Sequence, residues 1–247
     1  MTCNMKTIIM SDLHGFLPAI TEEFDLMLLG GDVCPFLNHA KNYQRDWLTH
    51  EFRDWLKRLP YKDQFSRVVM CAGNHDFIFE GIGKRKLADL LKETDNGDPT
   101  PRLVYLDNEE YDFECIEDTG IETYRIFATP YCKPFGNWAF MRENLDKYYE
   151  FIPEGLDILL THDAPKVDQY GIIREGRWKG ENAGNAVLAE HIQRAKPRYA
   201  FHGHIHSSLH ALQEIDGVRY ANVSIMNEDY DPFNLPLVLE IKKEGLE

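Results

Sequence analysis

Eight polar side chains able to bind metal or transfer protons follow directly after short apolar segments of the chain. They are Asp12, His14, Asp32, Asn74, His75, His162, His204 and His206. Imidazole, carboxylate and carboxamide groups without thiolates suit a borderline divalent ion such as Mn, Fe, Zn, Co or Ni. One tetrahedral ion needs about four protein ligands at most, and more than four remain when His75 is set aside for another role. We therefore expect two divalent ions that share a carboxylate.

The apolar segments that precede these residues are predicted to be buried β-strands. Five of them end at polar clusters: 6–10 before SDLHG, 24–29 before GGD, 67–71 before AGNHD, 156–160 before THDAP and 198–201 before HGHIH. Residues 218–223 and 237–241 have the composition of further strands. In open α/β sheets, ligands bind in the crevice beyond the carboxyl ends of the strands. Side chains far apart in the sequence can therefore meet there.

Helical patterns lie between the strands. Apolar residues recur at helical spacing over 47–59 and stop at Pro60, and similar patterns occupy 87–91 and 183–195. Strands that alternate with helices indicate a layered α/β fold. The segment 94–129 differs, because 102–106 and 122–128 are typical of paired strands. A mixed sheet or a sandwich is therefore favoured over a purely parallel sheet.

Composition narrows the function classes. The chain has 247 residues, of which 43% are hydrophobic, and its formal net charge of −14 would repel nucleic acid. No DNA binding is expected. The N-terminal residues lack the features of a signal peptide, and no segment is long and apolar enough to cross a membrane, so no membrane association is expected. The five cysteines lack metal-knuckle spacing and are predicted to be reduced thiols, which favours a cytoplasmic location.

The polar clusters occur in an order that resembles a known superfamily. The motifs are D-L-H at 12–14, G-D at 31–32, G-N-H-D at 73–76, T-H at 161–162 and G-H-I-H at 203–206. This set resembles the calcineurin-like metallophosphoesterases. From Pro130 onward, PYCKPFGNWAF, DILLTHDAP and YANVS are similar to the metallophosphoesterase-domain-containing branch, which is related to class III cyclic nucleotide phosphodiesterases. The resemblance implies one domain over 1–247, an α/β four-layer sandwich of two mixed β-sheets flanked by helices.

The resemblance also implies a role for each motif residue. Asp12, His14 and His206 would bind the first ion, Asn74, His162 and His204 the second, and Asp32 would bridge them. Manganese is the favoured metal. His75 matches the histidine that protonates the leaving oxygen. Asn137, Trp138 and Asn185 lie in polar loops and are candidate substrate contacts.

One position departs from the superfamily pattern. Many members carry an aspartate three residues after the bridging one, which orients the acid histidine, and here that position is Pro35. Asp76 is the candidate replacement. His202 is expected to be structural, and His39, His50, His191 and His210 are expected at the surface.

The predicted function is hydrolysis of a small phosphodiester, such as a cyclic nucleotide, by in-line attack of a hydroxide that bridges the two ions. Two alternatives stay open. The same ions could serve a phosphomonoesterase, including a protein Ser/Thr phosphatase, or the chain could be a metal-binding scaffold without activity.

Overall fold

Two β-sheets form the centre of the molecule in the computed structural model, which describes residues 4–95, 102–117 and 120–243. The first sheet has the strand order β11-β1-β2-β3-β4. Its strands are β1 (Asn4–Met10), β2 (Leu26–Gly30), β3 (Arg67–Cys71), β4 (Leu103–Tyr105) and β11 (Leu237–Lys242). Strands β1 to β4 are parallel, whereas β11 runs antiparallel to β1 at one edge. The sheet is therefore mixed.

The second sheet has the strand order β5-β6-β7-β8-β10-β9. Its strands are β5 (Glu109–Glu117), β6 (Gly120–Thr129), β7 (Ile158–Thr161), β8 (Tyr199–His202), β9 (Gln213–Ile215) and β10 (Val218–Asn222). Strands β6, β7, β8 and β10 are parallel, and the outer strands β5 and β9 are antiparallel to their neighbours. Both predicted strands of the segment 94–129 exist, but they lie in different sheets. Strand β4 pairs with β3, and β6 pairs with β5, a strand that the sequence did not predict.

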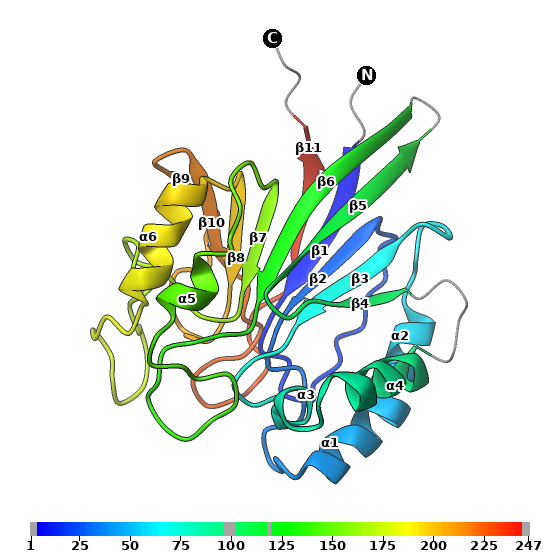
Figure 1. Ribbon diagram of the computed structural model, residues 1–247, viewed down its shortest axis with the longest axis horizontal. Coiled ribbons are helices and arrows are strands. Elements are labelled where there is room, and N and C mark those ends of the chain that lie inside the picture. Colours follow the sequence, from blue (N-terminus) through cyan, green and yellow to red (C-terminus); the bar gives the residue numbers. More distant parts are fainter. Residues whose placement is uncertain (1–3, 96–101, 118–119, 244–247) are drawn as a thin grey trace.

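The helices cover the two outer faces of this pair of sheets (Figure 1). On the first sheet lie α1 (Lys41–Trp47), η1 (Leu48–Phe52) and α2 (Arg53–Arg58), which follow one another without a break, and α3 (Phe77–Gly81) and α4 (Lys84–Thr94). On the second sheet lie α5 (Asp146–Tyr149) and α6 (Ala186–Ala195). Helix α2 ends just before Pro60, where the sequence predicts the end of a helix.

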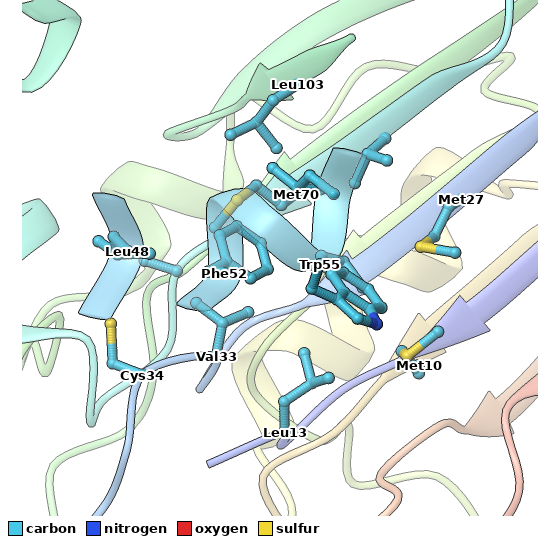
Figure 2. Close-up of a cluster of buried hydrophobic side chains, with 14 of the residues drawn as sticks. Met10, Leu13, Met27, Val33, Cys34, Leu48, Phe52, Trp55, Met70 and Leu103 are labelled. Carbon is cyan, nitrogen blue, oxygen red and sulfur yellow. The ribbon is translucent and has the colours of Figure 1, made fainter. Parts of the chain in front are cut away.

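Alternation of side chains along the strands produces three separate cores. In β1, Ile8 and Met10 face the helices, whereas Ile9 faces the second sheet. Figure 2 shows part of the helix-side core, in which Phe52 and Trp55 meet residues of the first sheet. A second core fills the space between the sheets, and a third lies under α5 and α6. The predicted four-layer sandwich is thus confirmed.

Two observations bear on the predicted chemistry and location of the chain. Cys115 is disulfide-bonded, so the prediction that all five cysteines are reduced is wrong. A single bridge requires no regular spacing of cysteines, so the absence of such spacing did not exclude it. Cys34, Cys71 and Cys132 are buried and free. Among the described residues, no helix combines the length and the apolar character that a membrane span requires.

Candidate metal centre

The polar clusters predicted from the sequence meet at the carboxyl ends of strands from both sheets. Strands β1, β2 and β3 of the first sheet lead to Asp12, Asp32 and Asn74, and β7 and β8 of the second lead to the clusters that begin at His162 and His204. A parallel bridge between Ser11 and Ser224 joins the two sheets beside the site. The structure therefore brings together residues separated by almost two hundred positions.

The first group of potential ligands consists of Asp12, His14 and His206. The Nε2 atoms of the two histidines are 3.2 Å apart, and Nε2 of His206 is 3.5 Å from Oδ1 of Asp12. All three side chains are buried, and their ligand atoms lie within 4.8 Å of one another. This spacing fits one divalent cation held by two imidazoles and a carboxylate.

The second group consists of Asn74, His162 and His204. Nε2 of His162 is 2.9 Å from Oδ1 of Asn74, and the rings of His162 and His204 have centroids 5.0 Å apart. Asp32 lies between the two groups. Its Oδ2 is 3.7 Å from Nε2 of His14 and 3.5 Å from Nε2 of His162. The carboxylate of Asp32 therefore occupies the position that a bridging ligand requires.

The backbone at these residues is held in an uncommon conformation. Asp12, His14, Asp32 and His204 have φ values of 56°, 46°, 51° and 68°, in the left-handed region that residues other than glycine rarely adopt. Such strain persists only where the surrounding structure imposes it, and it is concentrated at functional sites. Here the positive φ values turn the chain sharply at or near the ends of the strands, so that the four side chains point toward a common centre.

Two glycines allow the ligand-bearing loops to approach one another closely. A Cβ atom on Gly203 would overlap the carboxylate of Asp12, and one on Gly73 would overlap Asp32 and His162. Glycine is therefore required at both positions for steric reasons, which explains why it precedes the asparagine in GNH and the histidine in GHIH.

Hydrogen bonds to backbone carbonyls orient two of the histidines. The Nδ1–H of His162 donates to Gly30 O at 3.0 Å, and that of His206 donates to Asn227 O at 2.8 Å. A carbonyl can only accept, so Nδ1 carries a hydrogen, and Nε2 is the nitrogen that can bind a cation. Both Nε2 atoms point into the cluster.

The electrostatics of the cluster favour cation binding. Burial raises the pKa of Asp32 well above its usual range, and the nearby carboxylates of Asp76 and Asp12 add to this effect. Burial acts in the same direction on Asp12, but the hydrogen bond and charge of His206 hold the pKa of Asp12 below its usual value. For His206, burial lowers the pKa, but the hydrogen bond to Asp12 and the charge of Asp12 together raise the pKa by more. The net shift is therefore upward. The upward shifts at Asp32 and His206 favour protons on these two ligands when no cation is bound.

His75 lies beside the cluster. Its Nε2 is 4.0 Å from Oδ2 of Asp32, and its backbone N–H donates to Oδ1 of the same carboxylate at 2.7 Å. Gln44, a fully buried residue of α1, donates from its amide to His75 O at 2.6 Å. Burial and then the charge of His39 lower the pKa of His75 to about 3. No motif or spacing in the sequence indicated a role for Gln44.

Asp76 does not contact the ring of His75, although the sequence made it the candidate for orienting that ring. Its Oδ1 accepts the backbone N–H of Cys34 at 2.8 Å, and its Oδ2 accepts those of Val33 and Gly73 at 3.2 Å and 2.8 Å. Both oxygens are thus used to join the loop after β2 to the loop after β3. Consecutive side chains point in different directions here, which explains why the prediction is wrong.

A cavity of about 650 Å³ opens over the metal centre. It is lined by Asp32, Asn74, His75, His204 and His206 from the centre and by aromatic residues that include Phe135, Trp138, Trp178 and Tyr230. Tyr230 has a φ of 63°, and its ring centroid is 4.7 Å from that of His14. It stacks on Phe36 at 4.6 Å. The sequence did not predict this aromatic wall, since Tyr230 follows no motif.

The three candidate substrate contacts have different surroundings. Trp138 lines the cavity, and its ring lies 4.5 Å from that of His75. Asn137 is exposed and does not line the cavity. Asn185 is buried, caps α6 by accepting the backbone N–H of Leu188 at 3.1 Å, and donates to Asp163 at 2.7 Å. The hydrogen-bonding groups of Asn185 are therefore used within the fold.

The remaining histidines also differ from one another. His202 is buried under Tyr170 at the end of β8, and burial lowers its pKa to about 4. His50 is exposed on η1. His39, which we expected to be a surface residue, is partly buried, and its Nε2 is 3.0 Å from Nδ1 of His75. Sequence spacing gave no reason to connect these two rings.

Comparisons with known proteins agree with this geometry. The chain is 30% identical over 229 residues to the human protein "Metallophosphoesterase domain-containing protein 1", an alignment that covers 85% of this chain and 65% of that protein. It is 27% identical to UPF0046 protein K07C11.7 of Caenorhabditis elegans, with 98% of this chain and 77% of that protein covered. The chain thus spans less than two thirds of the length of its human relative.

Solved structures share the fold at low sequence identity. Phosphopantetheinyl hydrolase from Mycobacterium tuberculosis superposes with a TM-score of 0.51 at 18% identity, covering 90% of each chain. TT1561 of Thermus thermophilus superposes with a TM-score of 0.50 at 12% identity, covering 89% of this chain and 88% of that one. The family model described as calcineurin-like phosphoesterase matches residues 5–208, which include every ligand candidate described above. The chain belongs to the calcineurin-like phosphoesterase family.

Proposed function

We propose that this chain is a metal-dependent phosphodiesterase that binds two divalent ions and hydrolyses small phosphodiesters, cyclic nucleotides among them. The observation that carries the proposal is the position of Asp32, whose carboxylate lies between two clusters of nitrogen and oxygen ligands and accepts the backbone N–H of His75. The residues from both sheets act as a single catalytic domain.

The donor set fits two ions. Asp12, His14 and His206 would hold the first, Asn74, His162 and His204 the second, and Asp32 both. Two bound dications would polarise the phosphoryl oxygens and supply a nucleophile at neutral pH, and manganese is the ion we favour. Their charge exceeds that of the two carboxylates, so the loaded site attracts an anionic substrate although the chain has a net charge of −14.

His75 is placed to protonate the leaving oxygen. Its Nε2 faces the carboxylate of Asp32, its backbone is held at both N–H and C=O, and Trp138 packs against its ring. An alkoxide leaving group needs a proton, and a positioned acid contributes about 10²- to 10⁴-fold to such reactions. The rings of Tyr230 and Trp138 line the cavity on this side of the centre, and both lie against the ring of His75.

The cavity supports a diester rather than a monoester as the substrate. A volume of about 650 Å³ is that of a small-molecule site. Its walls carry Phe135, Trp138, Ile173, Trp178 and Tyr230. A diester keeps an organic group on each side of phosphorus, and aromatic walls can pack against a flat group such as a nucleobase. A terminal monoester phosphate has no second group to fill this space.

A panel of phosphoesters tests the proposal. We expect the Mn²⁺-loaded protein to have a higher kcat/KM for bis-p-nitrophenyl phosphate than for p-nitrophenyl phosphate, and to hydrolyse at least one 2′,3′- or 3′,5′-cyclic nucleotide. A preference for the monoester or for phosphopeptides would replace the proposal with a phosphatase. Fewer than one metal ion per chain by elemental analysis, with no turnover of any ester, would identify a scaffold.

A further inference from the structure

The partner of the His75 ring comes from an unexpected position in the same loop that carries Asp32. Many members of the superfamily that the motifs resemble have an aspartate three residues after the bridging carboxylate, and here that position is Pro35, which has no hydrogen-bonding side chain. Four residues further on, His39 places Nε2 at 3.0 Å from Nδ1 of His75. The loop between β2 and α1 thus still supplies a partner to His75, but the partner is an imidazole.

We propose that His39 is a positioning residue for phosphoester hydrolysis: it donates a hydrogen bond from Nε2–H to Nδ1 of His75 and thereby keeps the hydrogen of the His75 ring on Nε2. This inference rests on the proposed function, because it assigns His75 the role of proton donor. It goes further by naming the residue that fixes both the direction and the tautomer of the His75 ring.

An imidazole partner differs from a carboxylate in the hydrogen bonds that it can make with the His75 ring. An ionised aspartate only accepts, so it requires a hydrogen on Nδ1 of its histidine. His39 can donate, which leaves the ring hydrogen of His75 on the other nitrogen. That nitrogen, Nε2, is 4.0 Å from Oδ2 of Asp32 and faces the place where a leaving oxygen would form. When Nε2 gives this hydrogen to the leaving oxygen, the N–H bond breaks, an O–H bond forms, and the electron pair stays on the His75 ring. The hydrogen bond from His39 to Nδ1 stabilises that pair until the ring regains a proton from solvent.

Packing is the competing explanation for the position of His39. Its ring centroid is 5.1 Å from that of Phe77 and 5.2 Å from that of Trp138, and Trp138 in turn lies against His75. A residue at position 39 could therefore act only as a flat wall. The experiment must separate the hydrogen bond from the stacking.

Two substitutions make this separation. His39→Phe keeps an aromatic ring but removes Nε2, whereas His39→Gln removes the ring but brings an amide N–H to the same region. His50→Ala, at an exposed histidine on η1, is the matched control. Each Mn²⁺-loaded variant is assayed with aryl phosphodiesters whose leaving phenols range from p-nitrophenol to phenol, and its metal content is measured in parallel.

We expect His39→Phe to lower kcat for the phenyl ester by about 10- to 100-fold, a part of the full effect of an acid catalyst, with a smaller loss for the p-nitrophenyl ester. KM and metal content should stay unchanged. His39→Gln should remain close to the native protein, as should His50→Ala. Native activity in His39→Phe, or equal losses in His39→Phe and His39→Gln, would overturn the proposal.

The hydrogen bond can also be tested without turnover. The ¹⁵N shifts of the His75 ring in the Zn²⁺-loaded protein report which nitrogen carries the hydrogen. We expect Nε2–H in the native protein and in His39→Gln, and a mixture of tautomers in His39→Phe. Nδ1–H in the native protein would overturn the inference about His39. If the native protein hydrolyses no ester in the panel, the proposed function fails, while the ring spectra still decide the hydrogen bond.

Discussion

Loading of the metal centre should release protons, and this linkage is the most direct test of how its ligands are arranged. The pKa values of Asp32 and His206 are both raised, by burial with neighbouring carboxylates in one case and by Asp12 in the other. At pH 6.5 the metal-free protein therefore keeps a proton on His206, whose pKa lies above its usual value of 6.5, and the upward shift at Asp32 favours the protonated form of that carboxyl as well. Filling both positions should displace about one to two protons, since ligands must be deprotonated to bind.

The sign of the effect follows from these upward shifts. A group with a raised pKa holds its proton to higher pH, so the affinity for metal falls as the pH falls. Each displaced proton weakens binding about tenfold per pH unit, so two protons weaken it about 100-fold. Titration calorimetry of Mn²⁺ binding in two buffers with different ionisation enthalpies gives the number of protons released.

A variant isolates the contribution of one ligand. His206→Asn keeps a donor oxygen but has no ring to titrate, so proton release at pH 6.5 should decrease by about one. No proton release in the native protein, or the same release in both proteins, would show that the carboxylates and imidazoles of the centre are not coupled in the way that the structure indicates.

Four further changes test individual residues. Asp32→Ala should remove both ions and all turnover, measured by elemental analysis and ester hydrolysis; retention of two ions would contradict its position between the clusters. His75→Gln should keep both ions and lose about 10²- to 10⁴-fold in kcat for esters with poor leaving groups, and an unchanged kcat would exclude it as the acid. Gly203→Ala should lower metal occupancy because the new Cβ displaces Asp12; two retained ions would contradict this. His202 has a pKa of about 4, so the unfolded chain takes up a proton at this residue as the pH falls below 6.5 while the folded chain does not. Urea unfolding at pH 7.5 and pH 5 should therefore show the native protein losing about 2 kcal/mol more than His202→Gln, and equal losses would refute this.

Much of the fold and of the ligand cluster could be predicted from local sequence features. Buried strands end at polar residues, and each such end leaves a short run of histidine, aspartate or asparagine next to glycine. Because the carboxyl ends of parallel strands share one edge of a sheet, this pattern alone places Asp12, Asp32 and Asn74 together at the edge of the first sheet, and His162 beside the His204 cluster at the edge of the second. Pro60 likewise marks the end of a helix by its chemistry alone.

What the sequence could not predict depends on contacts between loops. His39 and Tyr230 reach the site from segments without motifs, and their position follows from the path of the chain in three dimensions. Strand β5 was not predicted from the sequence, because its exposed face carries charged residues. Its extended conformation depends on its antiparallel pairing with β6. The prediction that Asp76 orients the ring of His75 is wrong because the side chains of consecutive residues in a turn rarely point in the same direction.

The division of ligands between the two sheets has a consequence for the whole molecule. Asp12, Asp32 and Asn74 belong to one sheet, and His162 and His204 to the other. Ions held by this set would join the halves of the sandwich as a cross-link does, in addition to the apolar core between them. Their free energy of binding is thereby added to the resistance of the sheets to separation. Removal of the ions by a chelator should therefore raise the rate of backbone amide hydrogen exchange in β1 and β7, at the interface between the sheets, before it raises that rate in either helical layer.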